Sequence, residues 1–153
     1  MGKRSNFERV ERDYYPTPIA AVEPLIPHLP YTFDYVEPCA GDARLIQHIK
    51  ELTGGHGECL YACDIDPRHP DVFTFDALTL DFGGRGVVDY CITNPPWDRK
   101  ILHPMIAHWM YRCPTWLLFD ADWMHTKQSA FYMSYCTKIV SVGRVKWIEG
   151  SKG

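Results

Sequence analysis

The chain has 153 residues, which is enough for one domain with a hydrophobic core and too few for two ordinary domains. Hydrophobic residues make up 46% and aromatic residues 14%, a composition typical of a globular domain rather than a low-complexity chain. The formal net charge of −3 argues against a stand-alone binder of duplex nucleic acid, because duplex affinity depends on Lys and Arg side chains that neutralise phosphates.

Membrane and export signals are not recognisable in the sequence. No apolar run reaches the roughly 18 residues that a membrane span needs, and residues 1–13 form a charged leader rather than an apolar signal peptide. The six cysteines lack Cys-x-x-Cys or zinc-ligand spacing, so we expect reduced cysteines and no metal site. We therefore expect a single domain over residues 1–153, in the cytoplasm and without a membrane partner.

Strand and helix patterns alternate along the chain. In chain order they predict a partial helix at 19–28, a strand at 33–39, a helix at 43–52, strands at 59–63, 72–75 and 87–93, a helix at 101–111, a strand at 115–119, a helix at 126–136 and a sixth strand at 138–142. Apolar strands that alternate with helices are typical of a parallel sheet covered on both faces. The sequence therefore predicts an α/β domain with one doubly wound, mostly parallel, Rossmann-like sheet.

Polar or special residues follow five of the predicted strands. They are Gly41-Asp42, Asp64, Asp76, Asn94 and Asp120. In open α/β sheets ligands bind outside the carboxyl ends of the strands, where the strand order reverses. If the first and fourth strands flank that point, the Gly41 turn and Asn94 face the same crevice.

The stretch Glu37-Pro38-Cys39-Ala40-Gly41 ends the first strand in a turn whose small residues allow a ligand to approach the backbone. With a single glycine it is also compatible with an ordinary turn. Asp64 follows Gly41 by 23 residues, near the spacing at which an acidic residue accepts hydrogen bonds from ribose. Together they indicate a nucleoside-containing cofactor, whereas Asp76 is interpreted either as an acceptor for adenine or as a cap.

The sequence Asn94-Pro95-Pro96-Trp97 combines two hydrogen-bond acceptors with an aromatic platform on a stiff loop. The Asn94 side-chain oxygen and the Pro95 carbonyl would accept from the amine of a planar base that stacks on Trp97. Two acceptors favour a more tetrahedral amine nitrogen with a usable lone pair. A simple turn with a packed Trp97 is the alternative.

This loop resembles the catalytic (D/N)-P-P-(Y/F/W) motif of AdoMet-dependent DNA amino-methyltransferases, chiefly the adenine-N6 group. Glu37–Gly41 resembles the first AdoMet-binding motif of that family, and Asp64 and Asp76 resemble the second and third. Tyr15-Pro16-Thr17-Pro18 is similar to its Y-x-T-P element. From 14 to 152 the chain is similar to small phage-encoded adenine methyltransferases.

The resemblance implies a class I methyltransferase fold, AdoMet as cofactor and DNA as partner, in the host cytoplasm if the chain is phage-encoded. It implies catalytic roles for Asn94, Pro95, Pro96 and Trp97. The residues implied in cofactor binding are Tyr15, Thr17, Pro18, Glu37, Pro38, Ala40, Gly41, Asp64, Ile65, Asp76 and Asn94.

Three features depart from the family pattern. Ala43 stands where many relatives have a second glycine, and no separate target-recognition domain fits in the chain, which suggests a homodimer or a partner subunit. The sequence ends just after the predicted sixth strand, so the last strand of the methyltransferase sheet is expected to be absent or truncated. Asp120–Trp123 is a further candidate to shape the target pocket.

Other functions remain open at this stage. The same type of loop occurs in methyltransferases that act on cytosine N4, on guanine N2 in RNA and on glutamine amides in proteins. A non-catalytic AdoMet-binding subunit is an alternative from a different class, although the intact loop Asn94–Trp97 argues against it.

Overall fold

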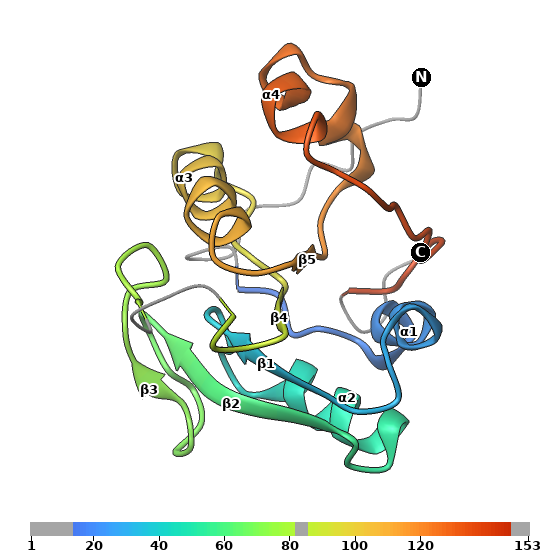
Figure 1. The fold of residues 1–153 in the computed structure, drawn as a ribbon, viewed down its shortest axis with the longest axis vertical. Coiled ribbons are helices and arrows are strands. Elements are labelled where there is room, and N and C mark those ends of the chain that lie inside the picture. The colour runs from blue at the N-terminus through green and yellow to red at the C-terminus, as the bar shows by residue number, and fades with distance from the viewer. Residues whose placement is uncertain (1–13, 82–85, 148–153) are drawn as a thin grey trace.

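The structure, a computed structural model, describes residues 14–81 and 86–147 (Figure 1). The predicted charged leader, residues 1–13, lies outside the described residues. Within them, no helix is long and apolar enough to cross a membrane.

Five parallel strands form one sheet with the order β3-β2-β1-β4-β5. The strands are β1 (Phe33–Glu37), β2 (Gly57–Asp64), β3 (Phe73–Thr74), β4 (Tyr90–Thr93) and β5 (Thr115–Leu117). Tyr35 of β1 lies opposite Cys59 on one side and Tyr90 on the other. The strand order therefore reverses between β1 and β4, as predicted, and the fold is a Rossmann-like α/β fold.

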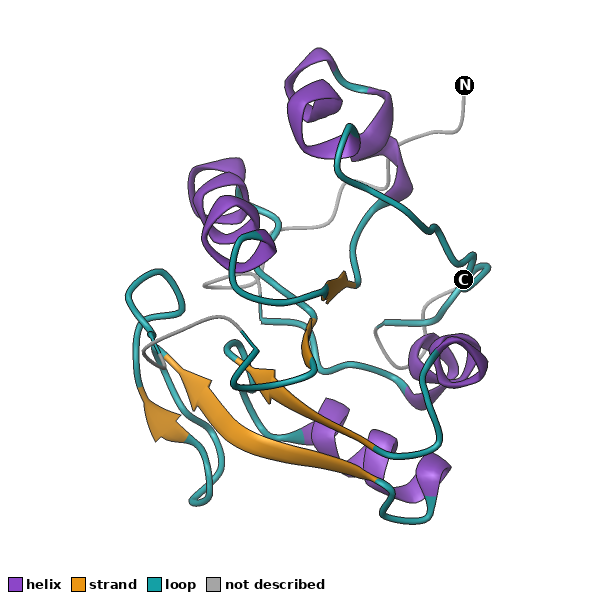
Figure 2. Ribbon diagram, in the orientation of Figure 1, coloured by secondary structure: helices purple, strands orange, loops and turns teal. Residues whose placement is uncertain are grey.

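Helices of different length lie before, between and after the strands. They are α1 (Ile19–Val22) with the 3-10 helix η2 (Glu23–His28), α2 (Arg44–Thr53), α3 (Arg99–Met110), the 3-10 helices η3 (Ala121–His125) and η4 (Lys127–Ser129), and α4 (Ala130–Met133). Of these, α2 connects β1 to β2 and α3 connects β4 to β5. The helix α2 ends at Gly54 in the left-handed conformation, and α3 begins after Asp98, whose carboxylate accepts from the Lys100 amide. In Figure 2, α2 and α3 lie on opposite sides of the sheet.

The two faces of the sheet carry separate hydrophobic cores because side chains alternate along β1 and β4. Tyr35 and Ile92 pack with Ile49 of α2 on one face. Val36 and Cys91 pack with Trp109 of α3 on the other face. The sheet is therefore doubly wound, as the alternating pattern predicted.

Two predicted elements differ from the structure. The segment 138–142 is not a strand: no described strand pairs with it, and Ile139 is 62% exposed, so its β-branched composition misled the prediction. The helix expected at 126–136 is reduced to η4 and α4, and the Ser134 hydroxyl donates to the Phe131 carbonyl at the place where α4 ends.

The six cysteines are unpaired, and they range from buried (Cys63, Cys91 and Cys113) to exposed (Cys136). In the described part of the chain, His, Cys, Asp and Glu side chains do not gather in threes that could hold a metal ion.

Candidate functional site

A cavity of about 520 Å³ opens at the carboxyl ends of β1, β2 and β4. The structure brings most of the predicted site residues together around it. Those that line the cavity are Tyr15, Thr17, Glu37, Pro38, Ala40, Gly41, Asp64, Ile65, Asp76, Asn94 and Pro96. Pro18, Pro95 and Trp97 are not among the lining residues.

The turn after β1 requires glycine at position 41. Gly41 has a φ of 52°, in the left-handed region, and a Cβ there would lie 2.8 Å from Cε2 of Tyr14. Ala43 follows with a φ of 63°, a conformation that glycine prefers. The turn therefore has a positive φ at two positions, of which the first is glycine and the second is alanine.

Asp64 connects this turn to the end of β2. Its Oδ2 accepts from the Gly41 amide at 2.8 Å, and its Oδ1 accepts from the Asp66 amide at 2.8 Å. A carboxylate has about four lone-pair sites, so each oxygen keeps capacity for another donor at the cavity wall.

Asp76 caps the turn that follows β3. Its Oδ1 accepts from the Leu78 amide at 2.9 Å. The capping role considered from the sequence is therefore present, and Asp76 also lines the cavity.

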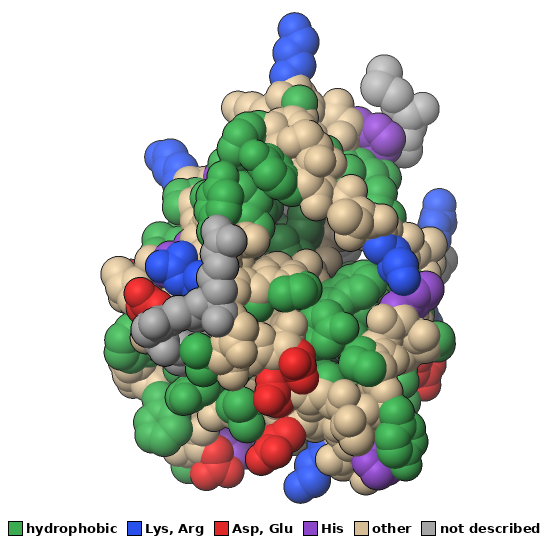
Figure 3. Space-filling view, in the orientation of Figure 1, with side chains coloured by type: hydrophobic (Ala, Val, Ile, Leu, Met, Phe, Trp, Pro, Cys, Tyr) green, Lys and Arg blue, Asp and Glu red, His purple; other side chains and the backbone are tan. Residues whose placement is uncertain are grey.

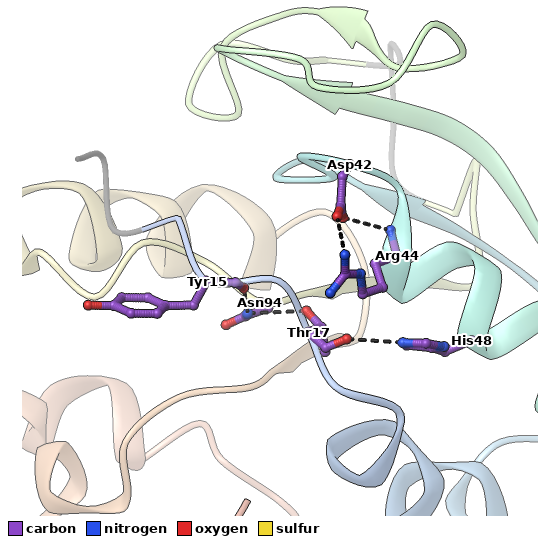
Figure 4. A network of polar contacts seen from close by, with 6 residues as sticks. All are labelled: Tyr15, Thr17, Asp42, Arg44, His48 and Asn94. Atoms are coloured by element: carbon purple, nitrogen blue, oxygen red, sulfur yellow. Dashed lines mark hydrogen bonds and ion pairs between the residues drawn. The ribbon is translucent and has the colours of Figure 1, made fainter. Parts of the chain in front are cut away.

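Asn94 ends β4, and contacts from the segment before α1 fix its side chain (Figure 4). Nδ2 lies 3.2 Å from the Tyr15 carbonyl oxygen and 3.2 Å from Oγ1 of Thr17. The Tyr15 carbonyl can only accept, so the nitrogen of the amide must face it. Oδ1 makes no hydrogen bond within residues 14–81 and 86–147. The side chain therefore presents an acceptor in a fixed orientation.

Thr17 is itself held from the opposite side. It is buried, and its carbonyl oxygen lies 3.0 Å from Nε2 of His48 on α2. Because the carbonyl only accepts, His48 carries a proton on Nε2 and donates it. His48 therefore anchors the segment that orients Asn94, as Figure 4 shows.

Trp97 lies outside the cavity lining and belongs to an aromatic cluster. Its ring centroid is 6.5 Å from that of Tyr15, with the planes tilted by 31°, and 6.1 Å from that of Trp147 in an edge-to-face arrangement. Trp97 is half-buried, so part of its surface stays accessible beside the buried Pro95. Trp147 therefore contacts the ring of Trp97.

Glu37 is the most deeply buried carboxyl of the site. It is 1% exposed, and Oε1 accepts from the Cys39 amide at 2.9 Å. Burial raises the pKa of Glu37 from its ordinary value of 4.5 to about 8, against the effect of that hydrogen bond. At neutral pH the group is therefore mainly a neutral acid.

The cavity as a whole is acidic. Among the residues that the structure describes, six carboxyl groups line it, and Arg68 is the one lining Lys or Arg side chain. The carboxyl groups belong to Glu37, Asp42, Asp64, Asp66, Asp76 and Asp98. Even with Glu37 neutral, this lining favours a cationic ligand with hydroxyl and amine donors and disfavours a ligand that carries phosphates.

No known protein family, curated protein or solved structure matches this chain. The residues of the cavity and their geometry are therefore the basis for assigning a function.

Tyr14 and Arg68 also line the cavity, although neither was predicted from the sequence as a site residue. The Arg68 guanidinium carbon lies 3.8 Å from the centroid of the Tyr14 ring, and the Arg68 amide donates to the Gly41 carbonyl at 2.9 Å. Burial and a hydrogen bond to Asp42 raise the pKa of Tyr14 to about 12. Tyr14 directly precedes the Y-x-T-P element, and that position was the available signal.

The candidate rim segment Asp120–Trp123 does not line the cavity. Asp120 caps η3, and Trp123 is buried, with its Nε1 donating to Nε2 of His103 at 2.9 Å. This segment packs against α3 instead of shaping the cavity.

Proposed function

We propose that the chain transfers a methyl group from AdoMet to the exocyclic N6 amine of adenine in DNA. The observation that carries the proposal is the orientation of Asn94. Its amide nitrogen is bound by Tyr15 and Thr17, which leaves an oriented acceptor at the end of β4, beside an acidic cavity of cofactor size.

The cavity fits AdoMet better than it fits a phosphate-bearing nucleotide. Its volume of about 520 Å³ lies in the range of small-molecule sites, and its carboxyl groups suit a ligand with a sulfonium, an amino group and ribose hydroxyls. Asp64 and Asp76 would accept from ribose and adenine, and Tyr15 and Thr17 would contact the methionine end. Bound there, AdoMet supplies an electrophilic methyl group whose bonding electrons remain on sulfur after transfer.

Asn94 and Pro95 would bind the amine that receives the methyl group. Oδ1 of Asn94 and the Pro95 carbonyl accept its two hydrogens, which draws the nitrogen lone pair out of conjugation and toward the methyl carbon. The nitrogen lone pair forms the new N–C bond, and one amine proton then leaves to solvent. Positioning supplies most of the rate, and no strong base is needed.

The ring of Trp97 would stack on the target base and so orient it. An adenine within a duplex cannot reach the cavity unless it leaves the stack, and the energy of stacking on an aromatic side chain offsets part of that cost. Tyr15 and Trp147 flank Trp97 and fix the position of its ring.

The proposal is tested by incubating the chain with methyl-labelled AdoMet and, in parallel, with DNA, RNA and a protein mixture. Products are hydrolysed and separated as nucleosides or amino acids. N6-methyladenine from DNA is the expected product. Label in N4-methylcytosine, N2-methylguanine or methylglutamine would show that the methyl acceptor is another amine or an amide. AdoMet binding without transfer would indicate a non-catalytic subunit.

A further inference from the structure

A second hollow, of about 590 Å³, lies between the first turn of α3 and the segment that contains η4 and α4. Its lining residues are Arg99, Lys100, His103, Gln128, Phe131 and Tyr132. Arg99 follows Trp97 by two positions, so the hollow begins where the loop Asn94–Trp97 ends. A role of this hollow in substrate binding rests on the function proposed above.

The hollow is basic, in contrast to the acidic cavity. Arg99 and Lys100 are exposed, and neither forms an ion pair within the described part of the chain. Arg99 is oriented instead by a neutral partner, because its Nη1 donates to Oε1 of Gln128 at 2.6 Å. On the face in Figure 3, acidic side chains gather in the lower half, away from α4. Because no carboxylate of the described residues forms an ion pair with them, Arg99 and Lys100 are available to contact an anionic ligand.

Aromatic rings form the remaining wall. Phe131 is 55% exposed and packs edge-to-face on Tyr132 at 5.3 Å between centroids and on Tyr135 at 5.5 Å. Tyr135 is 54% exposed. Exposed aromatic rings beside unpaired cations are the combination with which proteins bind unpaired nucleic-acid strands.

His103 makes the wall rigid and does not add a third cation. Its ring lies 4.9 Å from the ring of Tyr132, and its Nε2 accepts from the Trp123 indole, which can only donate. Nε2 therefore carries no proton, in agreement with a pKa that burial and the nearby Arg99 lower.

We propose that this hollow binds an unpaired stretch of DNA next to the target adenine. Arg99 and Lys100 contact its phosphates, and Phe131 stacks on one of its bases. A base within a duplex has no free face for Phe131, so the surface favours a single strand over a duplex. This preference is consistent with a net charge of −3, which is unfavourable for duplex binding.

The test measures binding of a fluorescent oligo(dT) and of a G·C duplex, neither of which contains adenine, by anisotropy at several salt concentrations. We expect oligo(dT) to bind more tightly than the duplex. Phe131→Ala should weaken binding by about 5- to 150-fold, which corresponds to the loss of one stacked base. Replacing both Arg99 and Lys100 by Gln should reduce the salt slope by about 1.4, since each phosphate contact on a single strand contributes about 0.7.

Matched controls are Phe73→Ala, a phenylalanine that is 73% exposed on β3, and Lys50→Gln on α2, and both should bind like the wild type. Thermal unfolding of each variant checks the fold. Equal binding by wild type, Phe131→Ala and the double Gln variant would overturn the proposal, as would an equal or higher affinity for the duplex. This binding test measures no methyl transfer, so its result is independent of the methyl-transfer assay. If the variants bind oligo(dT) more weakly, as expected, but the wild type transfers no methyl group, only the catalytic proposal is refuted.

Discussion

Nδ2 of Asn94 and the carbonyl oxygen of Tyr15 are 3.2 Å apart, although the two residues are separated by 79 positions in the sequence. The contact joins the segment before α1 to the end of β4, and it decides which end of the amide is available as an acceptor. The loop proposed to hold the substrate and the segment proposed to hold the cofactor are therefore one structural unit.

Thr17→Val should lower turnover, because it removes one of the two acceptors that hold Nδ2 of Asn94. One neutral hydrogen bond is worth about 1 kcal/mol, so we expect a five- to tenfold loss of kcat. Thr17→Ser keeps the hydroxyl and serves as the control. Steady-state kinetics with both variants would contradict this role if valine and serine gave the same kcat.

Gly41→Ala should destabilise the protein and weaken AdoMet binding. The new Cβ would lie 2.8 Å from the Tyr14 ring, and a φ of 52° costs alanine about 1–2 kcal/mol. Ala43→Gly is the matched control: it relieves a positive φ but loses a buried methyl group, so its stability should change by less than about 1 kcal/mol. Urea unfolding measures both. Equal effects would show that backbone shape at position 41 is unimportant.

Glu37→Gln should change how stability depends on pH. The folded pKa of about 8 lies above the ordinary value of 4.5, so between these values the folded protein keeps a proton that the unfolded chain releases. Stability of the wild type therefore falls as pH rises through this window. The free energy of unfolding of the variant, relative to the wild type, should rise by up to about 1.4 kcal/mol per pH unit.

The measurement for Glu37 is a series of urea unfolding curves at several pH values from 5 to 8. Glu58→Gln, on the exposed surface of β2, is the control and should show a constant difference from the wild type. A constant difference for Glu37→Gln as well would mean that Glu37 is ionised in the folded protein.

Asp64→Ala should weaken AdoMet binding by about tenfold or more, since it removes acceptors from the proposed ribose site and from the Gly41 and Asp66 amides. Asp64→Asn keeps one acceptor oxygen and should bind AdoMet with intermediate affinity. Titration calorimetry separates the three proteins. An unchanged affinity in Asp64→Ala would refute the assignment.

The sheet and the position of the site could be predicted from local patterns. Apolar strands, each followed by polar residues, are enough to place Gly41, Asp64 and Asn94 at one edge of a parallel sheet. The contacts of Asn94 could not be predicted in the same way, because the bond to Tyr15 depends on how two distant segments pack. Sequence alone also could not show that Ala43 adopts a positive φ.

The segment 138–142 shows the limit of local propensity. Its β-branched residues predicted a strand, but a strand forms only where a neighbour offers free backbone groups, and no described strand pairs with it. Similarly, the basic hollow at α3 and α4 combines residues from two segments, and neither segment alone indicates a binding surface.

The most direct test of the central claim compares wild type and Asn94→Ala for two properties, AdoMet affinity by calorimetry and formation of N6-methyladenine in DNA. The account predicts that turnover falls by at least about 100-fold while AdoMet affinity changes little, because the oriented acceptor acts on the receiving amine. Turnover close to that of the wild type in Asn94→Ala would contradict the account.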